Sequence, residues 1–216
     1  MGLRELKKEQ TRELIADTAW RLFADRGFDR VTVAEVAREA MVAAATVFNY
    51  FPTKEDLFFF RLEAYGAHLV EAIHKRPPGE PALDAFRRFL LEPAGLLAQL
   101  DAGDPQAVER LRTVHRMIDA SPTLQAREQR ALSGYADALA ALLAQESGAA
   151  AEDVGARVAA NAMMGVQRAL IDHVRRRILD DDRPERLAAD VRRLGERAIA
   201  LLAEGLGDYA AKPAKD

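Results

Sequence analysis

The chain has no cysteine among its 216 residues, which excludes disulfides, thiolate metal sites and a cysteine nucleophile. It also lacks an apolar run near the roughly 18 residues that a membrane-spanning helix needs. The basic residues between Met1 and Arg12 are not followed by the apolar stretch of a signal peptide. We therefore expect a cytoplasmic protein that does not associate with a membrane.

The chain also has little net charge, because 31 Lys and Arg residues are balanced by 34 Asp and Glu, for a formal net charge of −3. Any binding of nucleic acid must then come from a local basic patch. The four histidines lack zinc-ligand spacing, and the sequence holds no Gly-rich phosphate loop and no G-x-S-x-G motif. We expect no cofactor, no metal and no catalytic residues, so the protein is not predicted to be an enzyme.

What the chain does have is 49% hydrophobic residues and a predominance of helix formers, with no sustained strand alternation. This composition predicts an all-α fold. Three short helical segments end near Phe51, and longer ones follow Lys54. We therefore predict a small domain over residues 1–53, a larger helical domain over residues 54–210, and a frayed tail over residues 211–216. A fourth helix, about Lys54 to Lys75, would join the two domains.

The first helix carries apolar and small residues at helical spacing and is expected to end at Gly27 in a left-handed conformation. These residues are Leu14, Ile15, Thr18, Ala19, Leu22 and Phe23. The second helix starts at a capping box, Thr32 with Glu35, and Val31 with Val36 can form a hydrophobic staple across that start.

A turn over residues 40–43 separates the second helix from a third short one, Ala44 to Tyr50, which Pro52 ends. Thr53 then caps the fourth helix. This is the order of a helix-turn-helix, whose second short helix enters the major groove of DNA. Val47 and Phe51 would face the core. The residues expected to face outward are Ala44, Ala45, Thr46, Asn49 and Tyr50.

The outward residue types suit base reading, since Asn bonds adenine and Ala or Thr methyls contact the thymine methyl. Lys54, at a helix start, is placed to meet a phosphate. Residues Arg12 to Leu57 as a set resemble the signature of the TetR family. The matching runs are Leu22-Phe23-Ala24-Asp25-Arg26-Gly27-Phe28, Val31-Thr32-Val33, Val36-Ala37 and Thr46-Val47-Phe48-Asn49-Tyr50-Phe51-Pro52-Thr53-Lys54-Glu55-Asp56-Leu57.

The resemblance implies an all-helical homodimer that binds a palindromic double-stranded DNA operator, with repression as the usual outcome. It implies that the C-terminal domain binds a small-molecule effector. It also implies phosphate contacts at Thr32, Thr46, Tyr50 and Lys54, and base-facing positions at Ala44, Ala45 and Asn49.

Three residues depart from the family pattern. Met41 stands where the family usually has Gly, and a left-handed non-Gly residue costs about 1–2 kcal/mol. Ala43 replaces a capping Ser, a loss of about 1 kcal/mol, and Phe48 replaces a Tyr. We expect these changes to affect DNA affinity more than the fold. Since charges nearly balance before Asp56, only Lys54 and the arm residues Arg4, Lys7, Lys8 and Arg12 are placed to meet phosphate, which predicts a modest salt dependence.

Two C-terminal helices carry patterns typical of a dimer interface. The last, about Pro184 to Gly205, has apolar residues spaced four and three apart, and the preceding helix, about Glu152 to Arg177, has small residues that permit close approach. The candidate interface residues are Val158, Ala162, Val166, Leu187, Val191, Leu194 and Leu201. Packing of the same faces within one chain is the alternative.

For the effector site we select aromatic, Met and orienting polar residues: Phe86, Phe89, His115, Met117, Asn161, Met164 and Arg168. The predominance of Phe and Met predicts a largely apolar effector. The alternative is that most of these residues are ordinary core or surface positions. We expect effector binding to move the fourth helix and so release DNA.

Two other classes of protein compete with this interpretation. An all-α enzyme could hold a metal on Asp180-Asp181-Asp182, although the run is more typical of a solvated linker before Arg183-Pro184. A helical scaffold for a partner protein would leave the outward surface from Thr46 to Lys54 without a purpose.

Overall fold

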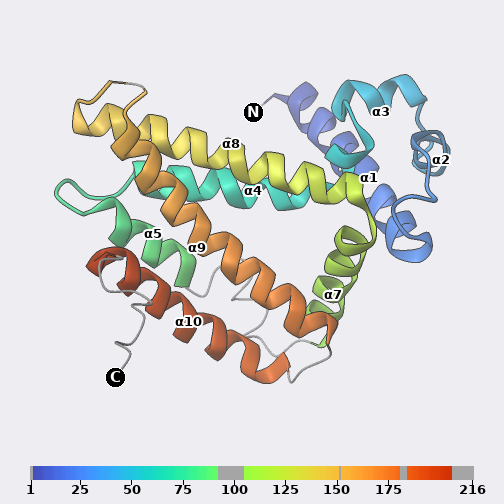
Figure 1. Cartoon of the computed structure of the whole chain (residues 1–216). Helices are drawn as coiled ribbons and strands as arrows, with labels where there is room; N and C mark the ends of the chain where they lie inside the picture. The colour runs from blue at the N-terminus through green and yellow to red at the C-terminus, as the bar shows by residue number, and fades with distance from the viewer. Residues whose placement is uncertain (1, 92–104, 151, 181–183, 206–216) are drawn as a thin grey trace. The chain divides into compact units, whose positions relative to one another are not determined.

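The computed structural model describes residues 2–91, 105–150, 152–180 and 184–205, and all regular structure in these ranges is helical (Figure 1). This confirms the predicted all-α class. The helices are α1 (Leu3–Arg26), α2 (Val33–Glu39), α3 (Ala44–Tyr50), α4 (Lys54–His74), α5 (Ala82–Leu91), α7 (Pro105–Ala120), α8 (Pro122–Ser147), α9 (Val154–Leu179) and α10 (Pro184–Glu204). None of the described helices is both long and apolar enough to cross a bilayer.

The helices form two compact units. One consists of Met1–Ala67 with Glu109–Ala131, and the other of His68–Val108 with Leu132–Asp216. Helices α4, α7 and α8 each run from one unit into the other. The first half of α4 packs with the helix-turn-helix: its Leu57, Phe58 and Phe59 are buried in the same hydrophobic core as residues of α1, α2 and α3. The functional division expected between residues 53 and 54 stays a prediction, and the tail over residues 211–216 lies outside the described residues.

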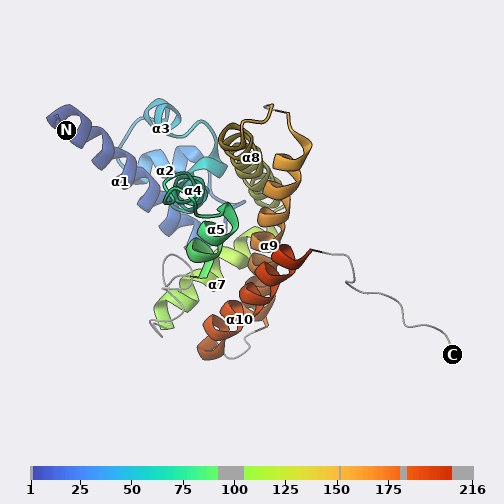
Figure 2. The ribbon, with the colours of Figure 1, turned by 90° about the vertical axis from the view of Figure 1, so that its left-hand side faces the viewer.

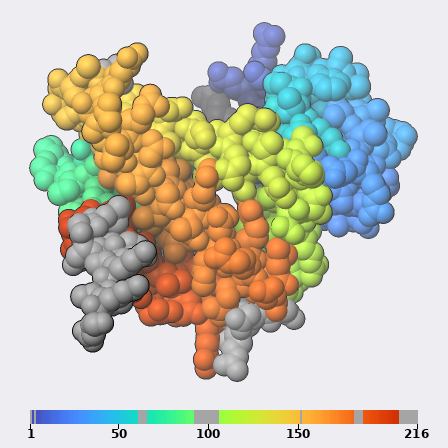
Figure 3. Space-filling view, in the orientation of Figure 1, coloured from blue at the N-terminus to red at the C-terminus, as the bar shows by residue number. Residues whose placement is uncertain are grey.

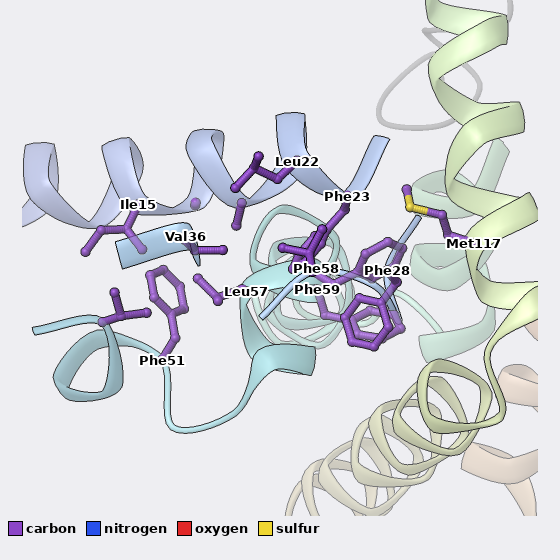
Figure 4. Close-up of a cluster of buried hydrophobic side chains, with 14 of the residues drawn as sticks. Ile15, Leu22, Phe23, Phe28, Val36, Phe51, Leu57, Phe58, Phe59 and Met117 are labelled. Carbon is purple, nitrogen blue, oxygen red and sulfur yellow. The ribbon is translucent and has the colours of Figure 1, made fainter. Parts of the chain in front are cut away.

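The core of the first unit lies between α1, the two short helices and the start of α4. Figure 4 shows Phe23, Phe28, Phe58 and Phe59 gathered at one end of this core. Their ring centroids are 5.1 to 6.3 Å apart, as in favourable aromatic pairs. The apolar face expected on α1 is buried as predicted, except at Leu14. Leu14 is 50% exposed, and the buried face of the helix begins at the next residue, Ile15.

The local start and stop signals are confirmed. Thr32 accepts a hydrogen bond from the Glu35 amide at 3.2 Å, and Glu35 accepts one from the Thr32 amide at 2.8 Å. Val31 and Val36, the expected staple, are both buried in the same core. Helix α1 ends before Gly27 as expected. Gly27 has a positive φ of 80°, but its ψ of 152° is extended rather than left-handed helical. This combination is open essentially to Gly alone.

In the second unit, α10 packs on α9 and α5 (Figure 2). Gly195 of α10 makes the close approach of α5 possible, because a Cβ at that position would lie 2.5 Å from Leu91 Cδ2. Arg87 reinforces the contact with two hydrogen bonds of 2.7 Å to the Glu196 carboxylate. Of the apolar pattern expected on α10, Leu187 and Val191 are buried in the single chain, while Leu194 and Leu201 are half-buried.

Candidate nucleic-acid interface

Helix α3 presents one face to the core and the other to the surface. Val47 and the residue that follows the helix, Phe51, are both buried, which confirms their expected orientation. On the opposite face Ala44, Ala45 and Asn49 are exposed, while Thr46 and Tyr50 are half-buried. Two apolar anchors therefore fix a seven-residue helix that presents Ala44, Ala45 and Asn49 outward, an arrangement that fits the major groove.

The turn before α3 has the strain that its sequence predicts. Met41 has a φ of 55° and its side chain is 90% exposed, so it adopts a conformation that favours Gly without gaining burial in return. The Val42 amide donates to the Ala37 carbonyl at 2.9 Å and closes the turn. Ala43 stands at the N-cap with a methyl group where a capping oxygen would be. Phe48, the third departure, is 52% exposed on α3.

Helix α4 begins at a second capping box. The Asp56 amide donates to Thr53 Oγ1 at 3.2 Å, and the Thr53 amide donates to Asp56 Oδ2 at 3.0 Å, so Thr53 caps α4 as expected. The other carboxylate oxygen of Asp56 accepts from the Arg127 guanidinium of α8 at 3.2 Å. Sequence analysis missed this last contact, because nothing local pairs residues so far apart in the chain.

Lys54 lies at the start of α4, but its ammonium group does not simply extend into solvent. Its Nζ lies 4.1 Å from the ring centroid of Phe28 and 5.9 Å from that of Phe23, a cation–π arrangement. Burial lowers the pKa of Lys54 below its ordinary value. The phosphate contact predicted for Lys54 would then come from the helix-start amides, or from its ammonium after it leaves the rings.

A hollow of about 610 Å³ joins the first turns of α1 to the end of α3. Lys8 and Arg12 of the basic arm lie in its wall together with Asn49 and Tyr50, while Arg4 and Lys7 are exposed elsewhere on the helix. The residues that complete the wall are Glu5 and Glu9. Two predicted DNA-contacting groups, the arm and α3, therefore share one surface. Sequence analysis had not placed acidic residues there.

Thr32, a predicted phosphate contact, is exposed at the start of α2. Its hydroxyl accepts from the Glu35 amide and donates to Glu35 Oε2 at 2.8 Å. The hydrogen bond from the Thr32 amide is the main reason that the pKa of Glu35 lies below its ordinary value, and the hydroxyl adds to it. A phosphate would therefore compete with Glu35 for the hydroxyl proton of Thr32.

The candidate effector residues belong to both units. Phe86 and Met164 are buried and Phe89 is half-buried in the second unit. Asn161 and Arg168 are exposed on α9, and the Asn161 amide donates to the Arg157 carbonyl at 2.8 Å. His115 and Met117 are buried in the first unit. Gln167, a further candidate for an orienting polar group, is buried, and its Oε1 has no hydrogen-bond partner among the described residues. The effector contacts stay predictions.

The candidate dimer residues all belong to the second unit and differ in how far they are buried. Leu187, Val191 and Val166 are buried by the chain itself, as packing within one subunit would require. The half-buried members are Ala162, Leu194 and Leu201. Val158 is 62% exposed on the outer side of α9, which forms part of the visible surface in Figure 3. Their role in dimerisation stays a prediction.

Among the described residues, no group of three or more His, Cys, Asp or Glu side chains is placed to hold a metal ion. Asp181 and Asp182 of the acidic run lie outside the described residues.

The all-helical fold, with the exposed face of α3 beside a basic arm, defines a helix-turn-helix protein of the DNA-binding regulator class. Residues 15–59 match the family of bacterial regulatory proteins called tetR, and residues 81–207 match the MftR C-terminal domain. The chain belongs to the TetR family of transcriptional regulators, which confirms the resemblance found in the sequence.

The chain is also similar to individual proteins, in sequence or in fold. The chain is 29% identical over 167 residues to the putative mycofactocin biosynthesis transcriptional regulator MftR of Mycobacterium tuberculosis, covering 77% of this chain and 81% of that protein. In fold it is similar to the SmeT–triclosan complex, with 18% identity, a TM-score of 0.57, and coverage of 96% and 100%. It is also similar to Thermus thermophilus FadR in complex with lauroyl-CoA, with 23% identity, a TM-score of 0.51, and coverage of 95% and 99%.

Proposed function

We propose that the chain is a cytoplasmic repressor that binds a palindromic DNA operator as a homodimer and leaves it when a small, largely apolar molecule binds. The observation that carries the DNA-binding part is the shared surface of α1 and α3. Lys8 and Arg12 flank the hollow into which Asn49 and Tyr50 also face, so cations and a base-reading amide are within reach of one stretch of duplex.

Within this surface the side chains have different roles. Asn49 reads adenine, and the exposed methyls of Ala44 and Ala45 contact thymine methyl groups. The phosphate contacts come from the predicted set of Thr32, Thr46, Tyr50 and Lys54, and from the arm. Phosphate contacts fix the register of the protein on DNA, while the α3 side chains decide the sequence.

The test is fluorescence anisotropy with duplexes that flank the protein's own gene, at several salt concentrations. We expect a specific duplex to bind, and Asn49→Ala to relax its preference by about 1–3 kcal/mol at one base pair. Gln145→Ala, which removes an exposed amide from α8, is the matched control and should change nothing. If no duplex binds more tightly than scrambled DNA, the proposed function is wrong. If Asn49→Ala leaves the preference intact, only the role of Asn49 is lost.

A homodimer follows from the operator symmetry, since two recognition helices must lie about 34 Å apart on the duplex. Support comes from α9, where Val154 and Val158 leave large apolar side chains 72% and 62% exposed in the single chain. We expect Val158→Asp to shift the dimer towards monomer in analytical ultracentrifugation. Leu14→Asp, at an equally apolar but separate exposed site, should not do so. A wild-type chain that is monomeric at assay concentrations and on DNA would contradict the dimer.

The apolar effector is supported by the buried Phe86 and Met164 of the second unit. Two proteins of similar fold are described in complexes with molecules that have a large apolar part, triclosan and lauroyl-CoA. These two compounds are suitable probes in a titration of the protein–DNA complex, with free coenzyme A as the control for the charged portion. Release of DNA by an apolar probe supports the proposal, whereas tight binding of a small, highly charged molecule contradicts it.

Helix α4 is the element that we expect to connect the two events. It starts at the capping box beside α3 and continues unbroken into the second unit. There Arg76 secures its end, donating to the Ile73 carbonyl at 2.8 Å and pairing with Glu146 at 2.5 Å. An effector can release DNA only if it binds the free conformation more tightly than the DNA-bound one. Equal effector affinity for free and DNA-bound protein would therefore rule out this mechanism.

A further inference from the structure

Arg12 occupies an unusual position for a residue of a solvent-facing basic arm. Its guanidinium carbon lies 4.4 Å from the centroid of the Phe60 ring and 5.7 Å from that of Phe51. Both distances are within the range of cation–π attraction. The same side chain lines the hollow with Asn49 and Tyr50. Arg12 is thus stacked on aromatic rings on one side and borders the DNA-facing surface on the other.

The two rings come from different elements. Phe51 is the residue that follows α3, and Phe60 belongs to the second turn of α4. They pack edge to face, with centroids 5.4 Å apart and planes at 82°. The Arg12 guanidinium therefore rests on a platform that exists only while α4 keeps its place beside the end of α3. Lys54 lies over the rings of Phe23 and Phe28, which do not belong to α4. Arg127 of α8 also lies over an α4 ring, 5.7 Å from the centroid of Phe59, but neither of these side chains lines the hollow.

We propose that Phe60 is a positioning residue that holds the Arg12 guanidinium against the operator backbone, so that the position of α4 sets DNA affinity through this stack. The inference rests on the proposed function and adds a specific link to its regulation. Arg has a flexible stem, and fixing it before DNA arrives lowers the entropy lost on binding. An effector that shifts α4 withdraws the Phe60 ring and leaves Arg12 mobile.

Phe60→Leu tests this link, because it keeps an apolar side chain and removes the ring. We expect operator affinity to fall about 5- to 30-fold for a dimer with two such stacks. Phe60→Tyr keeps the ring and should restore the wild-type affinity. Phe60→Met is a second ring-free variant whose flexible side chain fills irregular space if Leu packs poorly. Thermal unfolding of each variant shows that it is folded at the assay temperature.

The decisive readouts are the salt dependence and a double-mutant cycle. Arg12→Ala should reduce the slope of log affinity against log salt by about 1 for each phosphate that Arg12 neutralises. Phe60→Leu should reduce it in the same direction by a smaller amount, and should have little further effect in the Arg12→Ala background. Arg130→Ala removes an exposed arginine of α8 in the same unit and should leave the slope unchanged.

Each outcome decides the matter. If Phe60→Leu weakens binding equally with and without Arg12, Phe60 supports the fold only and the proposal is wrong. An unchanged affinity and slope in Phe60→Leu, with a wild-type chain that binds its operator, removes the proposal and leaves the proposed function standing. If Arg130→Ala lowers the salt slope as much as Arg12→Ala does, the slope does not report a specific contact between Arg12 and phosphate, and the proposal is wrong. If the wild-type chain binds no operator, the proposed function and this inference both fall.

Discussion

Replacing Met41 with Gly should stabilise the protein. Met41 has a φ of 55°, and a residue with a Cβ in this conformation costs about 1–2 kcal/mol relative to Gly. Its side chain is 90% exposed, so its removal forfeits little burial. Gly also makes the unfolded chain more flexible, which offsets about 0.4–1 kcal/mol of the gain. With the middle of each range, the expected net increase in the free energy of unfolding is about 0.8 kcal/mol.

The assay is thermal and urea unfolding of Met41→Gly beside Met41→Ala. A gain of this size raises Tm by about 1–4 °C in a chain of this length. Met41→Ala keeps the Cβ and hence the strain, so it should lie close to the wild type. The reasoning is refuted if Met41→Gly is less stable than the wild type, or if Met41→Ala gains as much as Met41→Gly. In the second case the benefit comes from removing an exposed apolar side chain.

Other positions give equally direct tests. Ala43→Ser supplies an oxygen at the α3 N-cap and should add about 1 kcal/mol to the free energy of unfolding measured in urea. Gly195→Ala should lower stability by about 1–2 kcal/mol, since overpacking outweighs the better helix propensity of Ala, and Leu91→Ala in the same chain should recover part of the loss. The pKa of Glu35 lies below its ordinary value of 4.5, so its carboxylate stabilises the fold above that value and the contribution disappears as pH falls through the lowered pKa. The stability difference between the wild type and Glu35→Gln should accordingly shrink between neutral pH and about pH 3, and a difference that grows would show the wrong sign.

The sequence was most informative where structure depends on residues a few positions apart. The capping boxes at Thr32 and Thr53, the burial of Val47 and Phe51, and the strained turn at Met41 all follow from local spacing and backbone preference. These features were sufficient to define the helix-turn-helix and to orient α3 correctly.

What depends on distant parts of the chain was harder to predict. Periodicity shows that a residue such as Met117 is buried, but not that it is buried with the helix-turn-helix rather than in the second unit. Asn161 and Arg168 were selected as polar groups for a cavity, yet they occupy the exposed side of α9. The stacking of Arg12 on Phe60 requires three-dimensional knowledge of how α4 meets α1.

The two glutamates in the hollow beside α3 bear on how such a protein finds its operator in a genome. On the proposed function, Glu5 and Glu9 repel any duplex that approaches Lys8 and Arg12, whatever its sequence. Binding to random DNA is almost wholly electrostatic, so these acids weaken it more than they weaken binding that also uses base contacts. The useful quantity for a regulator is its preference for one site over the very many competing ones. Changing Glu5 and Glu9 to Gln should then tighten binding to scrambled DNA more than binding to the operator, and a smaller pool of molecules would remain free to search.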